Sequence, residues 1–217
     1  MFLRGFNNWI KSLLINKYSA LAGRNPSVFD ICAGKGGDIN KWQRQYPSHY
    51  VALEYQQALI DKAIERLKSR DIPKYPSIFI VADAGDKNTT IDHVLRDHEE
   101  FKGFGRNIVF DIVSCQFSMH YLFETEDKLR AFLKNVTCKL EPGGYFIGTT
   151  VDAERVIATV RERGGPEMAI GNKYFSIRIG QNAYPKEAEG KPTSPYGLKF
   201  YFYLKDAVGI ERMTEGR

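Results

Sequence analysis

The stretch that decides the fold is Phe29-Asp30-Ile31-Cys32-Ala33-Gly34-Lys35-Gly36-Gly37-Asp38. A strand-like run leads into a turn rich in glycine, and a helical stretch follows. Glycine lets the backbone approach a ligand closely, and a helix N-terminus attracts negative charge. The order predicts a strand, a ligand-binding turn and a helix, although such turns also use glycine for purely structural reasons. The GxxxxGKS/T phosphate loop is absent, and the lack of a clean GxGxxG weakens a dehydrogenase interpretation.

Outward from this turn, short β-rich runs alternate with stretches of helical spacing. The runs are Ser27–Cys32, Tyr50–Glu54, Ile78–Ala82, Ile108–Cys115 and Tyr145–Thr150. Between them, apolar residues follow one helical face over 58–67 and another over 129–140. This alternation indicates a parallel sheet with helices on both faces, whose strands all end at one edge. The predicted fold is Rossmann-like α/β.

Two carboxylates follow later strands. Glu54 ends the second strand about 20 residues after the glycine turn, where an acid accepts hydrogen bonds from ribose hydroxyls. Asp83 ends the third strand, where a carboxylate can accept a hydrogen bond from an adenine amino group. For Asp83, a helix N-cap or turn aspartate is an equally good interpretation.

Two further regions flank the predicted core domain of residues 27–165. Residues 1–26 are predicted to be an amphipathic helical segment that completes the pocket, with Phe6 and Trp9 as core residues that hold the helix in place. Residues 166–217 are predicted to be a β flap, in which the runs Lys173–Ile179 and Leu198–Leu204 pair as an antiparallel hairpin.

From the composition we expect a protein that is neither secreted nor membrane-spanning. The chain has 217 residues, and 31 basic minus 26 acidic side chains leave a net charge of +5, which permits a polyanionic partner without demanding one. Three widely spaced cysteines predict no disulfide framework and a reducing intracellular compartment. No apolar run approaches the ~20 residues of a membrane span. The histidines have no ligand spacing with cysteine, so no metal site is expected.

Four sequence blocks narrow the interpretation. They are Phe6-Asn7-Asn8-Trp9-Ile10-Lys11, Gly34-Lys35-Gly36-Gly37-Asp38, Cys115-Gln116-Phe117-Ser118-Met119-His120-Tyr121 and Gly143-Gly144-Tyr145-Phe146-Ile147-Gly148-Thr149-Thr150. Together they closely resemble the eukaryotic mRNA cap (guanine-N7)-methyltransferases, which are class I enzymes that use S-adenosylmethionine (AdoMet). The resemblance implies methylation of the guanine cap at N7 in the nucleus, without a metal. It also implies the capped 5′ end of RNA as substrate and a protein partner from the capping machinery.

The resemblance implies a role for each matched residue. Cofactor-binding roles fall on Lys11 for the AdoMet carboxylate, Cys32, Gly34 and Gly36 for the methionine part, Glu54 for the ribose, Asp83 for the adenine, and Gln116 and Tyr121, which complete the pocket. Cap-binding roles fall on Asn7 and Asn8, on Lys35, Lys41 and Arg66 for the phosphates, on His120 against the guanine, and on Glu211 at the guanine edge.

The chemistry of these residue types fits the implied reaction. Guanine N7 carries a lone pair and no proton, so methyl transfer needs in-line positioning and no general base. Lysine and arginine suit a triphosphate bridge. Lys41 and Arg66 would equally suit a solvated helix face, and a lone histidine such as His120 is more often a core or turn residue with satisfied hydrogen bonds.

The sequence departs from the family at three places. Cys32 stands where the family has a glycine, and Glu54 where it has an aspartate. The family's guanine-reading glutamate aligns with Arg212 without a gap, or with Glu211 after a one-residue gap. The family's last helix and final two sheet strands have no counterpart before Arg217, so an open sheet edge that a partner completes is expected.

Two other functions stay open. One is a truncated, non-catalytic module that binds AdoMet or RNA, and the other is a methyltransferase that acts on another RNA or a small molecule.

Overall fold

The structure is a computed structural model, which describes residues 3–69, 75–88, 91–101, 108–163, 165, 167–180 and 194–204. The chain folds as two compact units: Ile10–Thr150 is one, and Met1–Trp9 together with Val151–Arg217 is the other. The domain boundaries expected from the sequence, at residues 26 and 165, stay a prediction. Each unit has its own sheet.

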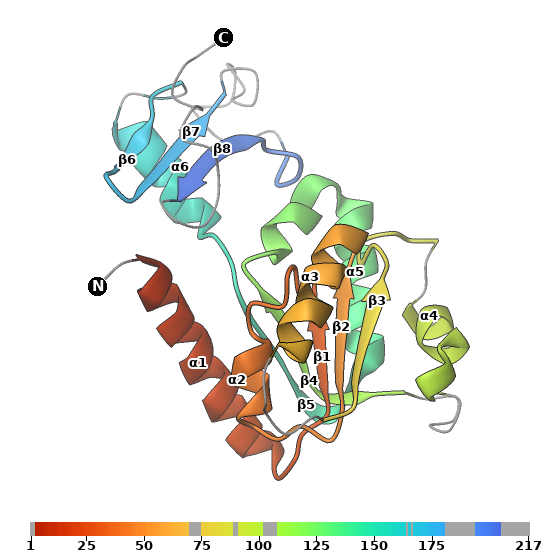
Figure 1. Cartoon of the computed structure of the whole chain (residues 1–217). Helices are drawn as coiled ribbons and strands as arrows, with labels where there is room; N and C mark the ends of the chain where they lie inside the picture. Colours follow the sequence, from red (N-terminus) through yellow and green to blue (C-terminus); the bar gives the residue numbers. More distant parts are fainter. Residues whose placement is uncertain are drawn as a thin grey trace. The chain divides into compact units, whose positions relative to one another are not determined.

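The first unit is built on a parallel five-stranded sheet (Figure 1). Its strands are β1 (Val28–Ile31), β2 (Tyr50–Glu54), β3 (Ser77–Val81), β4 (Phe110–Gln116) and β5 (Leu140–Thr149), in the spatial order β3-β2-β1-β4-β5. The central strand β1 is buried along its whole length and pairs with both β2 and β4. All ladders are parallel, so the predicted Rossmann-like sheet is confirmed.

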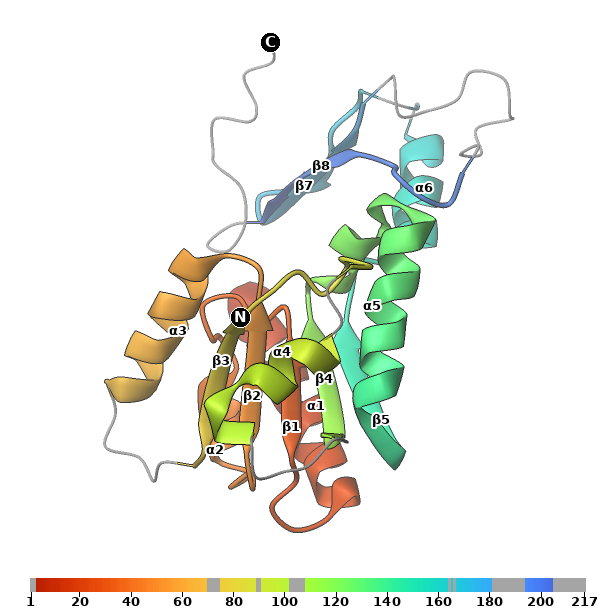
Figure 2. The ribbon, with the colours of Figure 1, turned by 90° about the vertical axis from the view of Figure 1, so that its right-hand side faces the viewer.

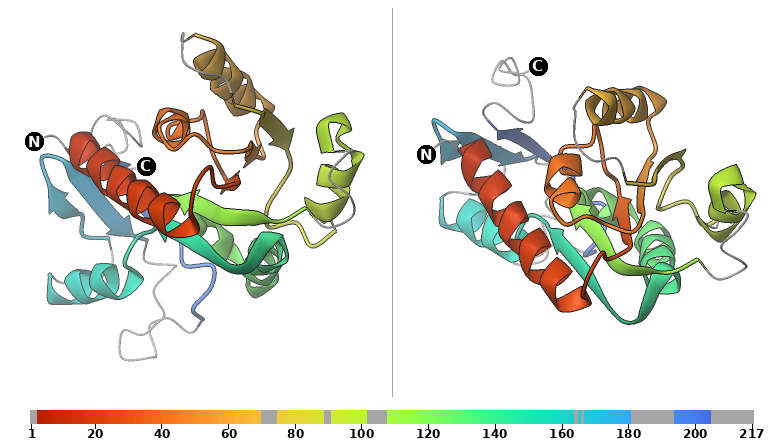
Figure 3. Two further views of the ribbon diagram at one scale, coloured as in Figure 1. Left: turned by 90° about the horizontal axis from the view of Figure 1, so that it is seen from below. Right: turned by 60° about the horizontal axis from the view of Figure 1, so that its bottom comes forward.

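Helices cover both faces of this sheet (Figures 2 and 3). Because successive side chains of a strand point to opposite faces, β1 contributes Val28 to one core and Phe29 to the other. The Val28 core receives Ile15 from α1 (Leu3–Ala22), Trp42 from α2 (Ile39–Gln43) and Ala63 from α3 (Gln57–Lys68). The Phe29 core receives Leu95 from α4 (Ile91–Asp97), Phe101 from the 3₁₀ turn η1 (Glu99–Phe101), Leu122 from η2 (Met119–Glu124) and Phe132 from α5 (Glu126–Lys139).

Strand β5 begins five residues earlier than the sequence indicates, at Leu140 instead of Tyr145. The pairing with β4 is irregular there, since Phe110 pairs with Leu140 and Ile112 pairs with Tyr145. The intervening Gly143 takes a φ of +86°, a conformation that favours glycine. Among the described residues, β5 is the last strand on its side of the sheet.

The prediction that Phe6 and Trp9 are core residues is wrong. Their side chains are 46% and 50% exposed, and the two rings contact each other with centroids 6.0 Å apart. The helical period explains the error, because the buried residue of α1 that joins the core is Ile15. Phe6 and Trp9 are nine and six residues before it, which turns them about 180° and about 120° around the helix axis from Ile15.

The second unit contains a helix and a small antiparallel sheet. Its elements are α6 (Ala153–Glu162), β6 (Ile170–Asn172), β7 (Phe175–Ile179) and β8 (Phe200–Leu204). Strand β7 pairs antiparallel with β8, which confirms the predicted hairpin, and the short β6 adds a third strand. Val160 of α6 packs on Ile177 and Ile179. Within the part of the chain described, no helix is long and apolar enough to span a bilayer.

Candidate functional site

The glycine turn follows β1 in a conformation that few residues tolerate. Cys32, Gly34 and Gly36 have φ values of +58°, +55° and +67°, in the left-handed region. A Cβ at Gly36 would overlap Cδ1 of Ile39 and lie 3.0 Å from Cβ of Ala63, so the absence of a side chain lets the turn pack on α3. A Cβ at Gly34 would meet no atom within 4 Å, so this side of the turn is open.

Glu54 joins the end of β2 to this turn. One carboxylate oxygen, Oε2, accepts a hydrogen bond of 2.9 Å from the Gly34 N–H. The other, Oε1, accepts from the N–H groups of Tyr55 at 3.0 Å and Gln56 at 3.3 Å. Glu54 is 4% exposed. Three backbone donors thus fix the carboxylate at the carboxyl edge of the sheet.

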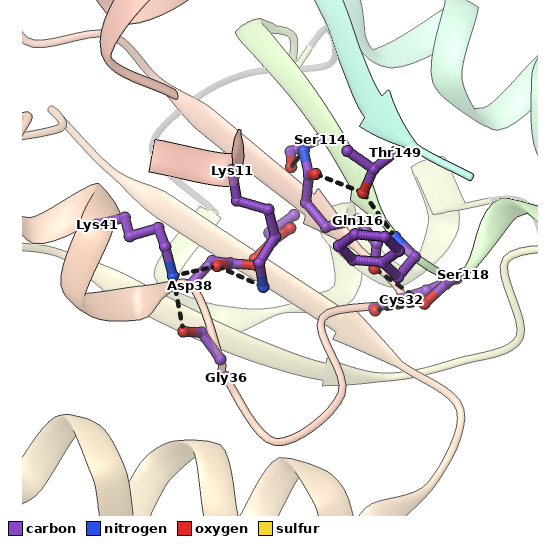
Figure 4. Close-up of polar contacts among 12 residues, drawn as sticks. Lys11, Cys32, Gly36, Asp38, Lys41, Ser114, Gln116, Ser118 and Thr149 are labelled. Atoms are coloured by element: carbon purple, nitrogen blue, oxygen red, sulfur yellow. Dashed lines mark hydrogen bonds and ion pairs between the residues drawn. The ribbon is translucent and has the colours of Figure 1, made fainter. Parts of the chain in front are cut away.

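Asp38, at the end of the glycine turn, holds two lysines (Figure 4). Lys11 from α1 and Lys41 from α2 place their Nζ atoms 2.8 and 2.7 Å from its carboxylate. The Lys11 and Asp38 side chains are only 14% and 8% exposed. The sequence marks Asp38 as the acid after the first strand but assigns it no ligand of its own, although its position just before α2 marks an N-terminal carboxylate. The two lysines expected to bind different ligands therefore share one counter-ion.

The other two residues expected at the cap phosphates lie beside the same turn. Arg66 on α3 donates from Nη1 to the Gly36 carbonyl oxygen at 3.1 Å. Lys35 lies in the turn itself and is exposed. The structure therefore brings Lys35, Lys41 and Arg66 together around residues 35–38.

Asp30 lies beneath the turn and was missed as a site residue. It is 3% exposed, and Tyr50 donates from Oη to its Oδ2 at 2.8 Å. Burial, and secondarily the nearby Asp38 carboxylate, raise its pKa to about 7, although hydrogen bonds from Tyr50 and Ser114 and the charge of Lys11 oppose this. The sequence did contain a signal for a special role of Asp30, because it is an acid inside the otherwise apolar run Val28–Ile31.

Gln116 ends β4 within a small polar network. Its Nε2 donates to Ser114 Oγ at 3.2 Å, and its Oε1 accepts from Thr149 Oγ1 at 3.0 Å. The next residue, Phe117, has a φ of +56° and donates its N–H to the Thr149 carbonyl at 2.8 Å. Ser114 and Thr149 thus orient the Gln116 amide, and neither was singled out from the sequence.

His120 and Tyr121 lie together on η2. Their ring centroids are 4.2 Å apart, and the Tyr121 side chain is 62% exposed. Burial lowers the pKa of His120, so its imidazole is neutral at pH 7. Its Nδ1 is buried, and no hydrogen-bond partner for it occurs among the residues that the structure describes.

Asp83 follows β3 next to the end of β2, since Val81 pairs with Glu54. Its Oδ1 accepts from the Gly85 N–H at 2.8 Å, as the turn interpretation predicts, and its Oδ2 lies 3.8 Å from Lys128 Nζ. The carboxylate is 44% exposed, so it remains accessible to a ligand.

Three residues expected at the cap belong to the other compact unit. Asn7 and Asn8 lie half-buried on α1 within the second unit. Glu211, together with its alternative Arg212, lies outside the described residues.

Cys32 and Cys115 are thiols in contact beside the turn. A hydrogen bond with Cys115, together with burial, raises the pKa of Cys32, so its thiol stays protonated at neutral pH. A search of the described residues finds no group of three His, Cys, Asp or Glu side chains that could hold a metal ion. The carboxyl edge of the sheet therefore offers carboxylates, ammonium groups, an amide and a neutral imidazole. These groups suit the binding and orientation of a ligand.

Comparison with known families covers almost the whole chain. The family model for the mRNA (guanine-N(7))-methyltransferase domain matches residues 1–213. The mRNA cap guanine-N(7) methyltransferase of Caenorhabditis briggsae is 40% identical over 216 residues, which cover 95% of this chain and 52% of that protein. The mRNA cap guanine-N(7) methyltransferase 1 of Arabidopsis thaliana is 36% identical over 213 residues, which cover 95% and 53%. The chain thus spans about half the length of these curated relatives.

Solved structures show the same fold. An S-adenosylmethionine-dependent methyltransferase from Clostridium acetobutylicum superposes with a TM-score of 0.51 at 16% identity, over 78% of this chain and 59% of that one. An amino pentose methyltransferase from Micromonospora echinaspora, solved with SAM bound, gives a TM-score of 0.50 at 17% identity, over 79% and 63%.

Proposed function

Because the chain belongs to the mRNA (guanine-N(7))-methyltransferase family, we propose that it transfers a methyl group from AdoMet to N7 of the guanine cap of mRNA. The observation that carries the proposal is the bond between the glycine turn and Glu54, where the Gly34 N–H meets a buried carboxylate at 2.9 Å. It lies at the carboxyl edge of β1 and β2, where open α/β sheets bind nucleotides.

The residues at this edge fit AdoMet, which supplies an electrophilic methyl group when bound. Each Glu54 oxygen keeps acceptor capacity beyond its backbone bonds, which suits ribose hydroxyls. Lys11 offers an ammonium group to the cofactor's carboxylate, and the open side of Gly34 leaves room for the methionine part beside Cys32 and Gly36. We assign Asp83 to the adenine amino group. Gln116, oriented by Ser114 and Thr149, and Tyr121 complete this pocket.

We assign binding of the cap to the remaining polar residues of the site. Lys35, Lys41 and Arg66 suit its phosphates, because they gather at one turn. His120 suits the guanine, because a neutral imidazole can donate or accept a hydrogen bond without placing a charge beside the base. Asn7, Asn8 and Glu211 keep their proposed cap-binding roles on the family resemblance alone.

The reaction needs positioning more than acid–base chemistry. Guanine N7 presents a lone pair without a proton, so no residue has to remove one. The chain's contribution is to hold N7 in line with the methyl group and to fix the polar groups around it. The three backbone bonds to Glu54 and the network around Gln116 supply such fixed groups.

Methyl transfer tests the proposal directly. The full chain is incubated with AdoMet carrying a labelled methyl group and with RNA that begins with unmethylated GpppN, and the digested product is analysed for N7-methylguanine. We expect labelled N7-methylguanine with the parent chain. We expect at least tenfold less with Glu54→Ala, because this variant removes the carboxylate that anchors the turn.

Glu65→Ala is a matched control, since Glu65 is an exposed acid on α3. It should keep the parent rate. A folded parent chain that binds AdoMet and cap analogue in calorimetry but forms no N7-methylguanine would contradict the proposal. Binding of AdoMet without the cap would support the non-catalytic module, and equal methylation of capped and uncapped RNA would support a different substrate.

We further propose that the activity operates in the nucleus on the capped 5′ end of RNA, together with a protein of the capping machinery. Imaging of a fluorescent fusion and affinity purification from nuclear extract test the two points. Exclusion of the fusion from the nucleus, or purification without any capping protein, would contradict them.

A further inference from the structure

The net charge of the chain is concentrated in its first quarter. Residues 1–53 contain seven basic side chains and two acidic ones, which gives 7 − 2 = +5, the same as the net charge of all 217 residues. The remainder therefore has 31 − 7 = 24 basic and 26 − 2 = 24 acidic side chains and no net charge. Both acids of the first 53 residues, Asp30 and Asp38, are buried. The charged side chains that this segment exposes are therefore all basic.

Part of this basic segment encloses a hollow at the far end of the strands from the glycine turn. The hollow has a volume of about 510 Å³ and lies between the end of α1, the turn before β1 and the end of α2. Its polar lining consists of Ser19, Arg24, Asn25, Arg44, Gln45 and Tyr46. Every lining residue belongs to the unit Ile10–Thr150.

The two arginines of the hollow differ from the lysines at the glycine turn. Lys11 and Lys41 are bound to Asp38, whereas Arg24 and Arg44 are exposed. Across the described ranges, neither guanidinium has an ion pair or hydrogen bond, and the buried Ser19 Oγ also lacks a partner. Unpaired guanidinium groups bind phosphate oxygens in a planar, two-bond geometry.

The backbone around the hollow is held in place. Asn25 donates from Nδ2 to the Tyr46 carbonyl oxygen at 2.7 Å, and Gln45 donates from Nε2 to Asn16 Oδ1 at 2.7 Å. The first bond joins the two segments that carry the arginines, and the second joins the Arg44 segment to helix α1. The Tyr46 ring is 62% exposed, so it offers an aromatic surface beside them.

A direct path connects the hollow with the glycine turn. Helix α2 begins immediately after Asp38, carries Lys41 and ends just before Arg44. Its length is about 8 Å for five residues at 1.5 Å each. A polyanion that leaves the turn along α2 therefore meets Lys41 first and the hollow next.

We propose that this hollow binds the single-stranded RNA that follows the cap, with Arg24 and Arg44 on backbone phosphates and Tyr46 stacked on a base. Cationic grooves with aromatic side chains bind single strands in this way without reading their sequence. The identity of the ligand as substrate RNA rests on the proposed function, but the binding itself is measurable without catalysis.

The test compares three variants of the full chain: Arg24→Ala/Arg44→Ala, Tyr46→Ala and, as a matched control, Arg96→Ala/Arg130→Ala. The control removes two exposed arginines from α4 and α5 on the opposite face of the sheet. Fluorescence anisotropy gives the Kd for a 20-nucleotide capped RNA and for an uncapped RNA of the same sequence at several salt concentrations. Methyl transfer is measured on that RNA and on GpppG.

We expect the Arg24→Ala/Arg44→Ala variant to bind both long RNAs at least tenfold more weakly. Its slope of log K against log salt should be shallower by about 1.4, which is two single-strand phosphate contacts at about 0.7 each. Tyr46→Ala should weaken RNA binding about tenfold with an unchanged slope. The control should match the parent, and methyl transfer to GpppG should be unaffected in every variant.

Parent-like RNA affinity and salt slope in the Arg24→Ala/Arg44→Ala variant would overturn the inference. An equal loss in the control variant would overturn it as well, because the effect would then reflect total charge and not this site. Absence of methyl transfer by the parent chain would instead refute the proposed function, and the anisotropy measurements would still decide whether the hollow binds RNA.

Discussion

A single carboxylate, Asp38, neutralises two ammonium groups that come from different helices. Lys11 and Lys41 lie 2.8 and 2.7 Å from it, and Asp38 and Lys11 are largely shielded from solvent. Removing one member of such a group leaves the others charged and uncompensated, which costs more than the net interaction contributes.

Asp38→Asn is therefore expected to lower the free energy of unfolding by about 3 kcal/mol, because two neighbouring ammonium groups lose their counter-ion. Urea denaturation measures the change. Asp127→Asn is the matched control, since the Lys87–Asp127 pair is exposed on both sides and its loss should cost less than about 0.5 kcal/mol. Equal effects of the two substitutions would contradict the expectation.

Asp30 predicts a pH dependence of stability. Its folded-state pKa is raised to about 7 from 3.8, so between these values the folded state holds a proton that the unfolded state releases. The contribution of Asp30 to stability is then most favourable at low pH and falls as pH rises through this window, by up to about 1.4 kcal/mol per pH unit. In the Asp30→Asn variant the side chain cannot ionise, so this loss of stability does not occur. The free energy of unfolding of the variant minus that of the parent should therefore increase from pH 5 to pH 8. Urea denaturation at both values tests this, and a pH-independent difference would contradict it.

Residue type and spacing were enough to predict that Glu54 and the glycine turn lie at the same edge of the sheet. A carboxylate at a strand end and glycines before a helix are visible in the sequence, and both meet in the structure at 2.9 Å. The contacts of Asp38 and Asp30 were not predicted, because their partners Lys11 and Tyr50 are 27 and 20 residues away in the sequence. Such partners become neighbours only through the packing of α1 and β2.

At the scale of elements, the pairing of β4 with β5 positions the network around Gln116. Gly148 pairs with Cys115 in this ladder, and a Cβ at Gly148 would lie 2.6 Å from the Cys115 carbonyl oxygen. Because that oxygen belongs to a buried strand, it cannot move aside as a flexible side chain can.

Gly148→Ala is accordingly expected to destabilise the first unit by about 2 kcal/mol, the usual cost of overpacking. It should also weaken binding of S-adenosylhomocysteine, since Gln116 and Thr149 follow directly in the same ladder. Thermal denaturation and calorimetry measure the two effects. Gly180→Ala is the control, because its Cβ would meet only Glu167 Oε1 at 3.7 Å. Unchanged stability of Gly148→Ala would contradict this account.

Elements with an unbroken sequence signal were predicted more accurately than elements without one. The run Tyr50–Glu54 coincides with β2, because its first four residues are apolar and buried and give a continuous signal that ends at Glu54. Helix α2 was expected after the glycine turn, whereas β6 has only three residues, too few to show a period. The first half of β5 was missed because Pro142 and two glycines disguise a strand whose pairing with β4 is irregular.

At the scale of the whole molecule, the two compact units predict an uneven response to ligand. All proposed AdoMet-binding residues belong to Ile10–Thr150, whereas α6 and β6–β8 belong to the other unit. Hydrogen exchange with and without S-adenosylhomocysteine should therefore show slowed exchange at residues 32–38, 54–56 and 114–117. At 100 times its Kd the ligand should stabilise its unit by about 2.7 kcal/mol. Protection confined to residues 151–204 would contradict the assignment.

The position of β1 in the sheet has a consequence for the order of folding. Its two neighbours are β2, which follows soon after, and β4, whose Ile112 pairs with Val28 across more than eighty residues. Contacts that close such long loops slow folding to milliseconds or longer, which stopped-flow refolding can measure. During synthesis, the apolar faces of β1 and β2 leave the ribosome long before β4 does. The nascent chain must therefore keep the future centre of its sheet from aggregating until its second half has been made.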